Sequence, residues 1–150
     1  NEDIYIMASE IVEKRIKEHE GYRDMVYLDS RGLATIGYGH LVTEEDNFEP
    51  KVQYPKAQLL ELFKKDLDRA EKEADELVGQ IEELHIVAKD CIIEMCFQLG
   101  KNGVRKFTKM LLALEERDYK TASLEMLNSK WHSQTPERCK ELSRLMEYCK

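Results

Sequence analysis

The sequence has 150 residues and a formal net charge of −7, with 42% hydrophobic and 35% charged residues. This length matches one domain of ordinary size, and the composition is typical of a globular protein rather than of a disordered chain. No apolar run approaches the roughly 18 residues that a membrane helix needs, so we expect no stable membrane insertion. The acidic balance argues against a nucleic-acid partner, because nucleic-acid-binding proteins normally carry a basic surface.

The first part of the chain predicts a helix followed by a β-hairpin. Hydrophobic residues recur with a helical period over residues 4–20, and Gly21 follows Glu20 directly, where a glycine stop is expected. From residue 25 to residue 38 the residues favour β-strands on both sides of the turn 29–32. Asp29 is therefore expected at the end of a strand, and the polar stretch 41–54 is predicted to be a surface loop.

The rest of the chain predicts helices. A long, strongly charged helix with a narrow apolar seam is expected over residues 55–78, with Pro55 at its start. Residues 81–150 are predicted to be helical, with a break at Gly100 and Gly103. Further helices are predicted over residues 107–114, 121–127 and 136–148.

The predicted fold class is α+β and mostly α, in a single domain of residues 1–150. This domain would consist of a small β-hairpin lobe (21–54), a long connecting helix (55–78) and a helical lobe (1–20 and 79–150).

Four cysteines lie in the second half of the chain: Cys91, Cys96, Cys139 and Cys149. They form no Cys-x-x-Cys pair, and the four histidines are scattered without ligand spacing, so we expect no metal site and no cofactor. Four mostly buried thiols are the favoured interpretation, and one or more disulfides are the alternative.

Glu20 and Asp29 are the first candidates for chemistry. A carboxyl group at a helix end and another at a hairpin turn have different environments, and two carboxyls kept in different protonation states can hydrolyse a glycosidic bond. Thr35, on the next strand, can orient a water molecule. From its position alone, Asp29 can equally be a plain turn residue. The chain has no HExxH, GxSxG, P-loop or dinucleotide-binding motif.

The order and spacing of these residues resemble a known family. The series Glu20-Gly21, Tyr27-x-Asp29, Gly32 and TIGYGH (residues 35–40) resembles the phage-type lysozymes, glycoside hydrolase family 24. A second block at residues 95–108 and a third at 129–138 resemble the helical lobe of the same family. The resemblance runs in order over roughly residues 10–148.

This resemblance implies a lysozyme-like two-lobe fold and a muramidase or endolysin that lyses bacterial cell walls. The enzyme would hydrolyse the β-1,4 bond between N-acetylmuramic acid and N-acetylglucosamine in peptidoglycan, with inversion. Glu20 would be the general acid, Asp29 would activate or stabilise, and Thr35 would help to place the attacking water. Arg138 corresponds to an arginine that pairs with the acid.

The resemblance also implies supporting and substrate-binding residues. His40 and Asp66 correspond to an ion pair between the hairpin and the connecting helix. Substrate contacts are implied for Leu41, Phe97, Gln98, Met110 and Glu125. Met110 and Glu125 depart from the residues found at these positions in the phage enzyme. The amino terminus is longer than in that enzyme, and we expect residues 1–8 to pack on the helical lobe.

The expected partner is peptidoglycan, and the expected protein is a monomer. Because peptidoglycan is anionic, the negative net charge would oppose binding, and a basic patch is expected to compensate. This basic patch comprises Lys101, Arg105, Lys106 and Lys109. A phage endolysin would wait in the host cytoplasm before its release to the periplasm and cell wall, and a secreted or tail-associated protein is the alternative. A lytic transglycosylase and a non-catalytic binding module are the other interpretations of function.

Overall fold

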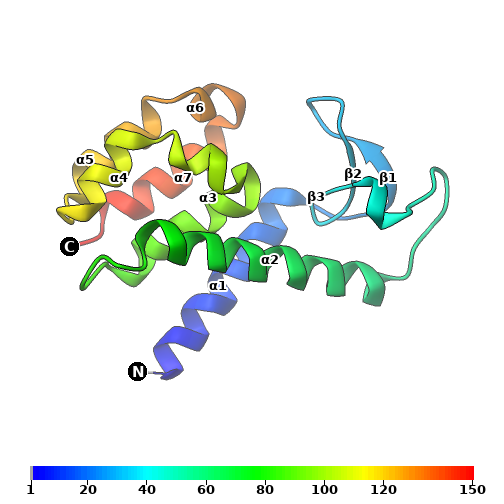
Figure 1. Ribbon diagram of the computed structural model, residues 1–150, viewed down its shortest axis with the longest axis horizontal. Coiled ribbons are helices and arrows are strands. Elements are labelled where there is room, and N and C mark those ends of the chain that lie inside the picture. The colour runs from blue at the N-terminus through cyan, green and yellow to red at the C-terminus, as the bar shows by residue number, and fades with distance from the viewer. Residues whose placement is uncertain (1) are drawn as a thin grey trace. The chain divides into compact units, whose positions relative to one another are not determined.

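The computed structural model describes residues 2–150, with side chains from residue 10 onward. The expected packing of residues 1–8 therefore lies outside the described side chains. The elements are labelled in Figure 1. In chain order they are α1 (Glu2–Glu20), β1 (Arg23–Leu28), β2 (Ala34–Gly37), β3 (His40–Leu41), the 3-10 helix η1 (Glu44–Asp46), α2 (Lys56–Val78), α3 (Ile86–Arg105), α4 (Thr108–Glu115), α5 (Tyr119–Leu127), α6 (Lys130–Gln134) and α7 (Pro136–Glu147).

The predicted fold class is confirmed. Most of the described residues are helical, and the strands form one small antiparallel sheet with the order β1-β2-β3 (Figure 1). The chain divides into two compact units, which we name by content. The sheet unit is Glu13–Arg69, and the helical unit is Asn1–Val12 together with Ala70–Lys150.

The core of the sheet unit is built from one strand and two helices. Ile16 of α1, Ile36 of β2, and Leu59 and Phe63 of α2 are almost fully buried. The α carbon of Gly37 lies so close to Leu59 that an added Cβ would be 3.5 Å from the Cβ of that leucine. Burying each of these large side chains stabilises the fold by about 1.5–3 kcal/mol. The hairpin is therefore anchored on helices, and its turn projects away from the core.

The structure differs from the predicted loop after residue 40. His40 and Leu41 form a third strand that pairs with β2, with Ile36 opposite His40 and Thr35 opposite Leu41. Gly37 and Gly39 have left-handed backbones, with φ values of 66° and 73°, which let the chain reverse within two residues. A strand of two residues is too short to produce an alternating pattern, and so the sequence does not reveal it.

The helical unit has α3 at its centre. Its residues Ala88, Cys91, Ile92, Met95 and Cys96 have no exposed surface. The predicted break is confirmed at Gly100, which has φ 74° and ψ 163°. The predicted break at Gly103 is wrong, because the helix resumes after Gly100 and includes Gly103 as far as Arg105. The sequence did not predict the short helix α6 as a separate element.

Polar contacts fasten the carboxy-terminal helices of this unit. The Trp131 indole N–H donates to the Gln98 side-chain oxygen at 3.0 Å, and the Gln98 amide donates to the Thr135 hydroxyl at 3.2 Å. The Ser123 hydroxyl donates to the Ser143 carbonyl at 2.9 Å. All four cysteines are buried and none is in a disulfide, so the preference for buried thiols is confirmed. Of the helices described, none has the length and apolar character needed to cross a membrane.

Candidate active site

Glu20 is the last residue of α1 and lies against the turn between β2 and β3. The helix ends here because Gly21 adopts a left-handed backbone with φ 71° and donates its N–H to the Lys17 carbonyl at 3.0 Å. The Glu20 carboxyl lies over the backbone of Gly39, where an added Cβ would come within 2.4 Å of Oε1. The missing side chain of Gly39 therefore leaves the space that the Glu20 carboxyl occupies.

Asp29 is the first residue after β1, and the hairpin turn holds its carboxylate. Its Oδ1 accepts the backbone N–H groups of Arg31 at 2.8 Å and of Leu33 at 2.9 Å. Its Oδ2 lies 3.3 Å from a guanidinium nitrogen of Arg31. The Leu33 N–H lowers the pKa of Asp29 most. Desolvation is the next largest effect and raises it, but the N–H, charge and guanidinium of Arg31 also lower it, so the pKa lies below its ordinary value. Asp29 is therefore ionised well into the acidic range.

The backbone of Leu33 joins Asp29 to Thr35. Its N–H donates to the Asp29 carboxylate, and its carbonyl accepts the Asp29 N–H and the Thr35 hydroxyl, each at 2.9 Å. The Thr35 side chain is only 3% exposed. Because its proton is directed to a carbonyl, the Thr35 hydroxyl can only accept a further hydrogen bond, such as one from a water molecule. Sequence analysis missed Leu33, since it acts through its main chain alone.

Tyr27 places the two carboxyl groups in one electrostatic neighbourhood. Tyr27 lies opposite Thr35 in the hairpin, and the Arg23 guanidinium lies 4.7 Å from the centre of the Tyr27 ring. Burial raises the pKa of Tyr27 most, the charges of Glu20 and Asp29 raise it further, and Arg23 lowers it. The phenol is neutral at acidic and neutral pH, and the charges of both carboxyl groups act on it.

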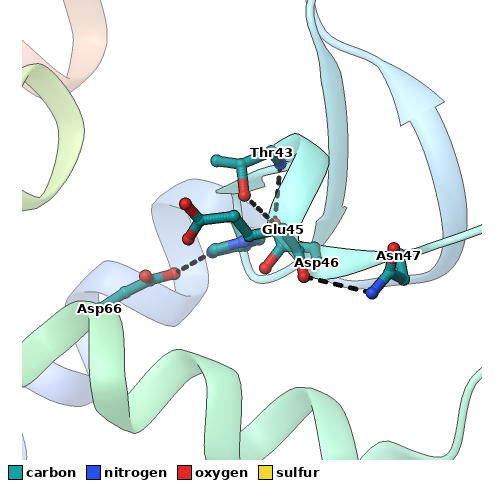
Figure 2. Close-up of polar contacts among 6 residues, drawn as sticks. Thr43, Glu45, Asp46, Asn47 and Asp66 are labelled. Carbon is teal, nitrogen blue, oxygen red and sulfur yellow. Dashed lines mark hydrogen bonds and ion pairs between the residues drawn. The ribbon is translucent and has the colours of Figure 1, made fainter.

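His40 is held between two carboxylates of the sheet unit. Its Nδ1 lies 2.8 Å from Oδ2 of Asp66 on α2, and its Nε2 lies 2.8 Å from Oδ2 of Asp46 in η1. Figure 2 shows Asp66 reaching in from α2, with Asp46 and Thr43 in the segment after β3. Desolvation lowers the pKa of His40, but the hydrogen bonds and charges of Asp66 and Asp46 outweigh it and raise the pKa above its ordinary value.

Asp46 is a second partner of His40 that sequence analysis missed. Besides His40, its Oδ2 accepts the backbone N–H of Thr43 at 2.8 Å and the Thr43 hydroxyl at 3.2 Å. Desolvation raises the pKa of Asp46, but the Thr43 N–H and the charge of His40 lower it by more. A protonated imidazole can donate to both carboxylates at once, so His40 links β3, η1 and α2 as a cation.

The remaining substrate-binding predictions are divided between the two units. Leu41 belongs to β3 and is 43% exposed. In the helical unit, Phe97 and Met110 are buried, Gln98 bonds to Trp131 and Thr135, and Glu125 is partly exposed on α5.

Arg138 lies in α7 and is almost fully buried in the helical unit. Its Nε donates to Oε2 of Glu94 on α3 at 2.8 Å, and the Glu94 side chain has no exposed surface. This contact fixes one side of the guanidinium from within the unit. Sequence analysis did not find Glu94, although an acidic residue on the apolar face of a central helix is a signal for a buried ion pair.

The expected basic patch is partly neutralised. Lys101 forms an ion pair with Glu76, whereas Arg105, Lys106 and Lys109 are exposed. No acidic residue occurs between Glu94 and Glu115 in the sequence, so the charge of this segment is locally positive. Among the described residues, no cluster of three or more His, Cys, Asp or Glu side chains has an arrangement that could hold a metal ion.

Comparison with known proteins identifies the family. A family model described as phage lysozyme matches residues 17–146. The probable T4-type lysozyme 1 of Dictyostelium discoideum is 32% identical over 91% of this chain and 93% of its own length. The probable T4-type lysozyme 2 of the same organism is 27% identical over 88% of this chain and 91% of its own length. The peptidoglycan hydrolase gp36 of Pseudomonas phage phiKMV is 29% identical over 89% of this chain, which corresponds to 15% of that protein.

The family match and the lysozyme relatives define an enzyme class. The chain, which is mostly helical with one small antiparallel sheet, is a glycoside hydrolase of the lysozyme type. The chain belongs to the phage lysozyme family.

Proposed function

We propose that this lysozyme hydrolyses the β-1,4 bond between N-acetylmuramic acid and N-acetylglucosamine in bacterial peptidoglycan, with inversion at the anomeric carbon. The name of the phage relative, a peptidoglycan hydrolase, supports the substrate class. The observation that carries the proposal is the ionised Asp29, whose carboxylate two backbone N–H groups hold, and whose charge acts together with that of Glu20 on the Tyr27 phenol.

In the proposed mechanism the two carboxyl groups have separate tasks. Glu20 donates its proton to the glycosidic oxygen as the bond to the anomeric carbon breaks. Asp29 accepts a proton from the water that attacks this carbon from the opposite face. After product release, Asp29 gives its proton to solvent and Glu20 takes one up, so the cycle is balanced. An inverting site needs about 6.5–9.5 Å between its carboxyl groups, which leaves room for the water.

Thr35 and Leu33 support this task for Asp29. The Thr35 hydroxyl, whose proton is committed to the Leu33 carbonyl, is available to accept a hydrogen bond from the attacking water. Arg138 is proposed to have the role of the family's arginine that pairs with the acid. Leu41, Phe97, Gln98, Met110 and Glu125 are proposed as substrate neighbours.

Purified peptidoglycan provides the direct test. The wild-type protein should release reducing ends and clear suspensions of permeabilised Gram-negative cells, and Glu20→Gln and Asp29→Asn should each abolish both activities. An exposed lysine such as Lys64 offers a matched control, because Lys64→Gln should keep full activity. If wild type and Glu20→Gln clear cells equally, or if neither does, the catalytic assignment is wrong.

Product analysis separates this proposal from its alternatives. An inverting hydrolase first gives the α-anomer of the new reducing end, which proton NMR detects before mutarotation. A lytic transglycosylase would leave a 1,6-anhydro end, and a non-catalytic binding module would bind peptidoglycan without releasing either product. A product with a retained β-anomer would overturn the inverting mechanism but leave the hydrolase intact.

The proposed site of action is the bacterial cell wall, with the protein as a monomer and without a nucleic-acid partner. A free endolysin would accumulate in the host cytoplasm before its release to the periplasm. A tail-associated domain is the alternative, since this chain corresponds to only part of the phage hydrolase that it resembles. In either setting the exposed Arg105, Lys106 and Lys109 are proposed to hold the anionic wall, so their replacement by glutamine should weaken wall binding at low salt.

A further inference from the structure

The two oxygens of the Asp29 carboxylate have different partners. Oδ1 accepts two backbone N–H groups, at 2.8 Å and 2.9 Å, and so both of its favourable directions are occupied. Oδ2 faces the guanidinium of Arg31 at 3.3 Å, without a backbone donor. Oδ2 is therefore the oxygen that remains for a proton from an attacking water molecule.

We propose that Arg31 is a positioning residue for the general base: its guanidinium orients Oδ2 of Asp29 as the proton-accepting oxygen and places a positive charge beside it. The inference rests on the proposed function of Asp29 and deepens it, since it assigns a regulator of the same carboxylate. In this role Arg31 acts on the substrate only through the carboxylate of Asp29.

The geometry distinguishes Arg31 from a structural ion pair. Its side chain is 58% exposed and that of Asp29 is 21% exposed, so their attraction is screened and contributes little to folding. The turn does not need the guanidinium, because backbone hydrogen bonds close it. The Asp29 N–H donates to the Leu33 carbonyl, and the Gly32 N–H donates to the Asp29 carbonyl, each at 2.9 Å. A side chain that the fold does not need, placed 3.3 Å from the proton-accepting atom, acts on that atom.

Other charged groups near Asp29 act differently. On β1 the Tyr27 phenol is neutral at acidic and neutral pH, and the charge of Asp29 contributes to its raised pKa. The charge of Glu20, at the end of α1, also raises the pKa of this phenol, and Arg23 lies over its ring. On β2 the neighbour of Asp29 is the uncharged Thr35, joined to it through Leu33. The guanidinium of Arg31 is the cation that lowers the pKa of Asp29, together with the backbone N–H groups.

Four variants of the full chain test the inference. Arg31→Gln removes the charge but keeps the backbone N–H that binds Oδ1, and Arg31→Glu reverses the charge. Arg31→Lys restores a cation as the conservative variant. Lys64→Gln is the matched control, because it removes one positive charge from an exposed position on α2 whose partner is Glu61. Melting temperatures of all four should stay close to that of the wild type.

The readout is the pH profile of kcat and KM on purified peptidoglycan. The acidic limb of the kcat profile should move to higher pH in Arg31→Gln and further in Arg31→Glu, and Arg31→Lys should restore most of the shift. An exposed ion pair of this kind changes a protonation equilibrium by about two- to five-fold, so kcat on the acidic limb should fall by that factor. Lys64→Gln should show no shift.

A second measurement separates this inference from the proposed function. NMR titration of the Asp29 side-chain carboxyl in the inactive Glu20→Gln background, with and without Arg31→Gln, reports the effect of Arg31 without any turnover. If Asp29→Asn retains activity, the proposed function is wrong whatever the titration gives. If Asp29→Asn is inactive but Arg31→Gln changes neither the titration nor the acidic limb, the role of Arg31 is overturned. A raised KM with an unchanged acidic limb would also overturn it, because Arg31 would then bind substrate.

Discussion

Replacing Gly39 with alanine should inactivate the enzyme while leaving it folded. A Cβ at this position would lie 2.4 Å from Oε1 of Glu20 and 2.8 Å from its Cδ. Carbon–oxygen contacts are normally about 3.3 Å or longer, so the Glu20 carboxyl must move by about 1 Å. A displacement of 1 Å can cost about 10²-fold in rate. We therefore expect kcat to fall about 100-fold with little change in KM.

The substitution also strains the backbone, because Gly39 has φ 73°. A left-handed conformation costs a non-glycine residue about 1–2 kcal/mol. For a chain of this size each kcal/mol lowers the melting temperature by about 2–4 °C. Thermal unfolding followed by circular dichroism should thus show a decrease of about 2–8 °C.

Gly32→Ala is the matched control for this strain. Gly32 has φ 79°, and no atom lies within 4 Å of the position where its Cβ would be. The melting temperature of Gly32→Ala should fall by a similar amount, and this variant should keep most of its kcat, measured by release of reducing ends. The reasoning is refuted if Gly39→Ala keeps the activity of Gly32→Ala, because Glu20 would then not depend on the space above Gly39.

Three further predictions concern stability and reactivity. The pKa of His40 is raised in the folded protein, so its interaction with two carboxylates stabilises the fold fully below about pH 6.5, the pKa of a histidine in the unfolded chain. This stabilisation is lost as the pH rises through the pKa of His40 in the folded protein. The melting temperature should therefore fall over this pH window in the wild type, and fall less in His40→Gln. Glu94→Ala leaves the buried Arg138 without this partner and should reduce the free energy of unfolding by about 3–5 kcal/mol in denaturant titrations, whereas an unchanged midpoint would contradict the ion pair. Burial raises the pKa of Cys149 to about 11, so Ellman's reagent at about pH 8 should label this thiol only after unfolding, and rapid labelling of the native protein would contradict its burial.

Sequence reasoning found the parts of the site that depend on side chains in a fixed order. The helix end at Glu20 and the turn at Asp29 follow from Gly21 and from the change to β-favouring residues near residue 25. Hydrophobic periodicity also predicted the helices, because a buried face imposes a repeat on the residues that form it. The break at Gly100 was predicted because glycine is unfavourable inside a helix and often interrupts one.

The parts that sequence reasoning missed have no such repeat. The strand β3 contains only His40 and Leu41, and it exists because the two preceding glycines reverse the chain. Asp46 lies in a polar stretch where an acidic residue normally faces solvent, and only the folded chain brings it to the imidazole of His40. Glu94 becomes recognisable as an ion-pair partner only when α7 packs against α3.

Leu33 donates its backbone N–H to Asp29 and accepts the Thr35 hydroxyl with its carbonyl, and the residue is 43% exposed. The position of Asp29, the proposed base, is therefore encoded in the length and dihedral angles of the turn rather than in the chemical identity of residue 33. Side chains at this position can be exchanged, for instance for a cysteine that carries a fluorescent label beside the base, without loss of the main-chain bonds. A single inserted or deleted residue between Asp29 and Thr35 would instead move Leu33 out of register and leave a folded sheet with no ordered base.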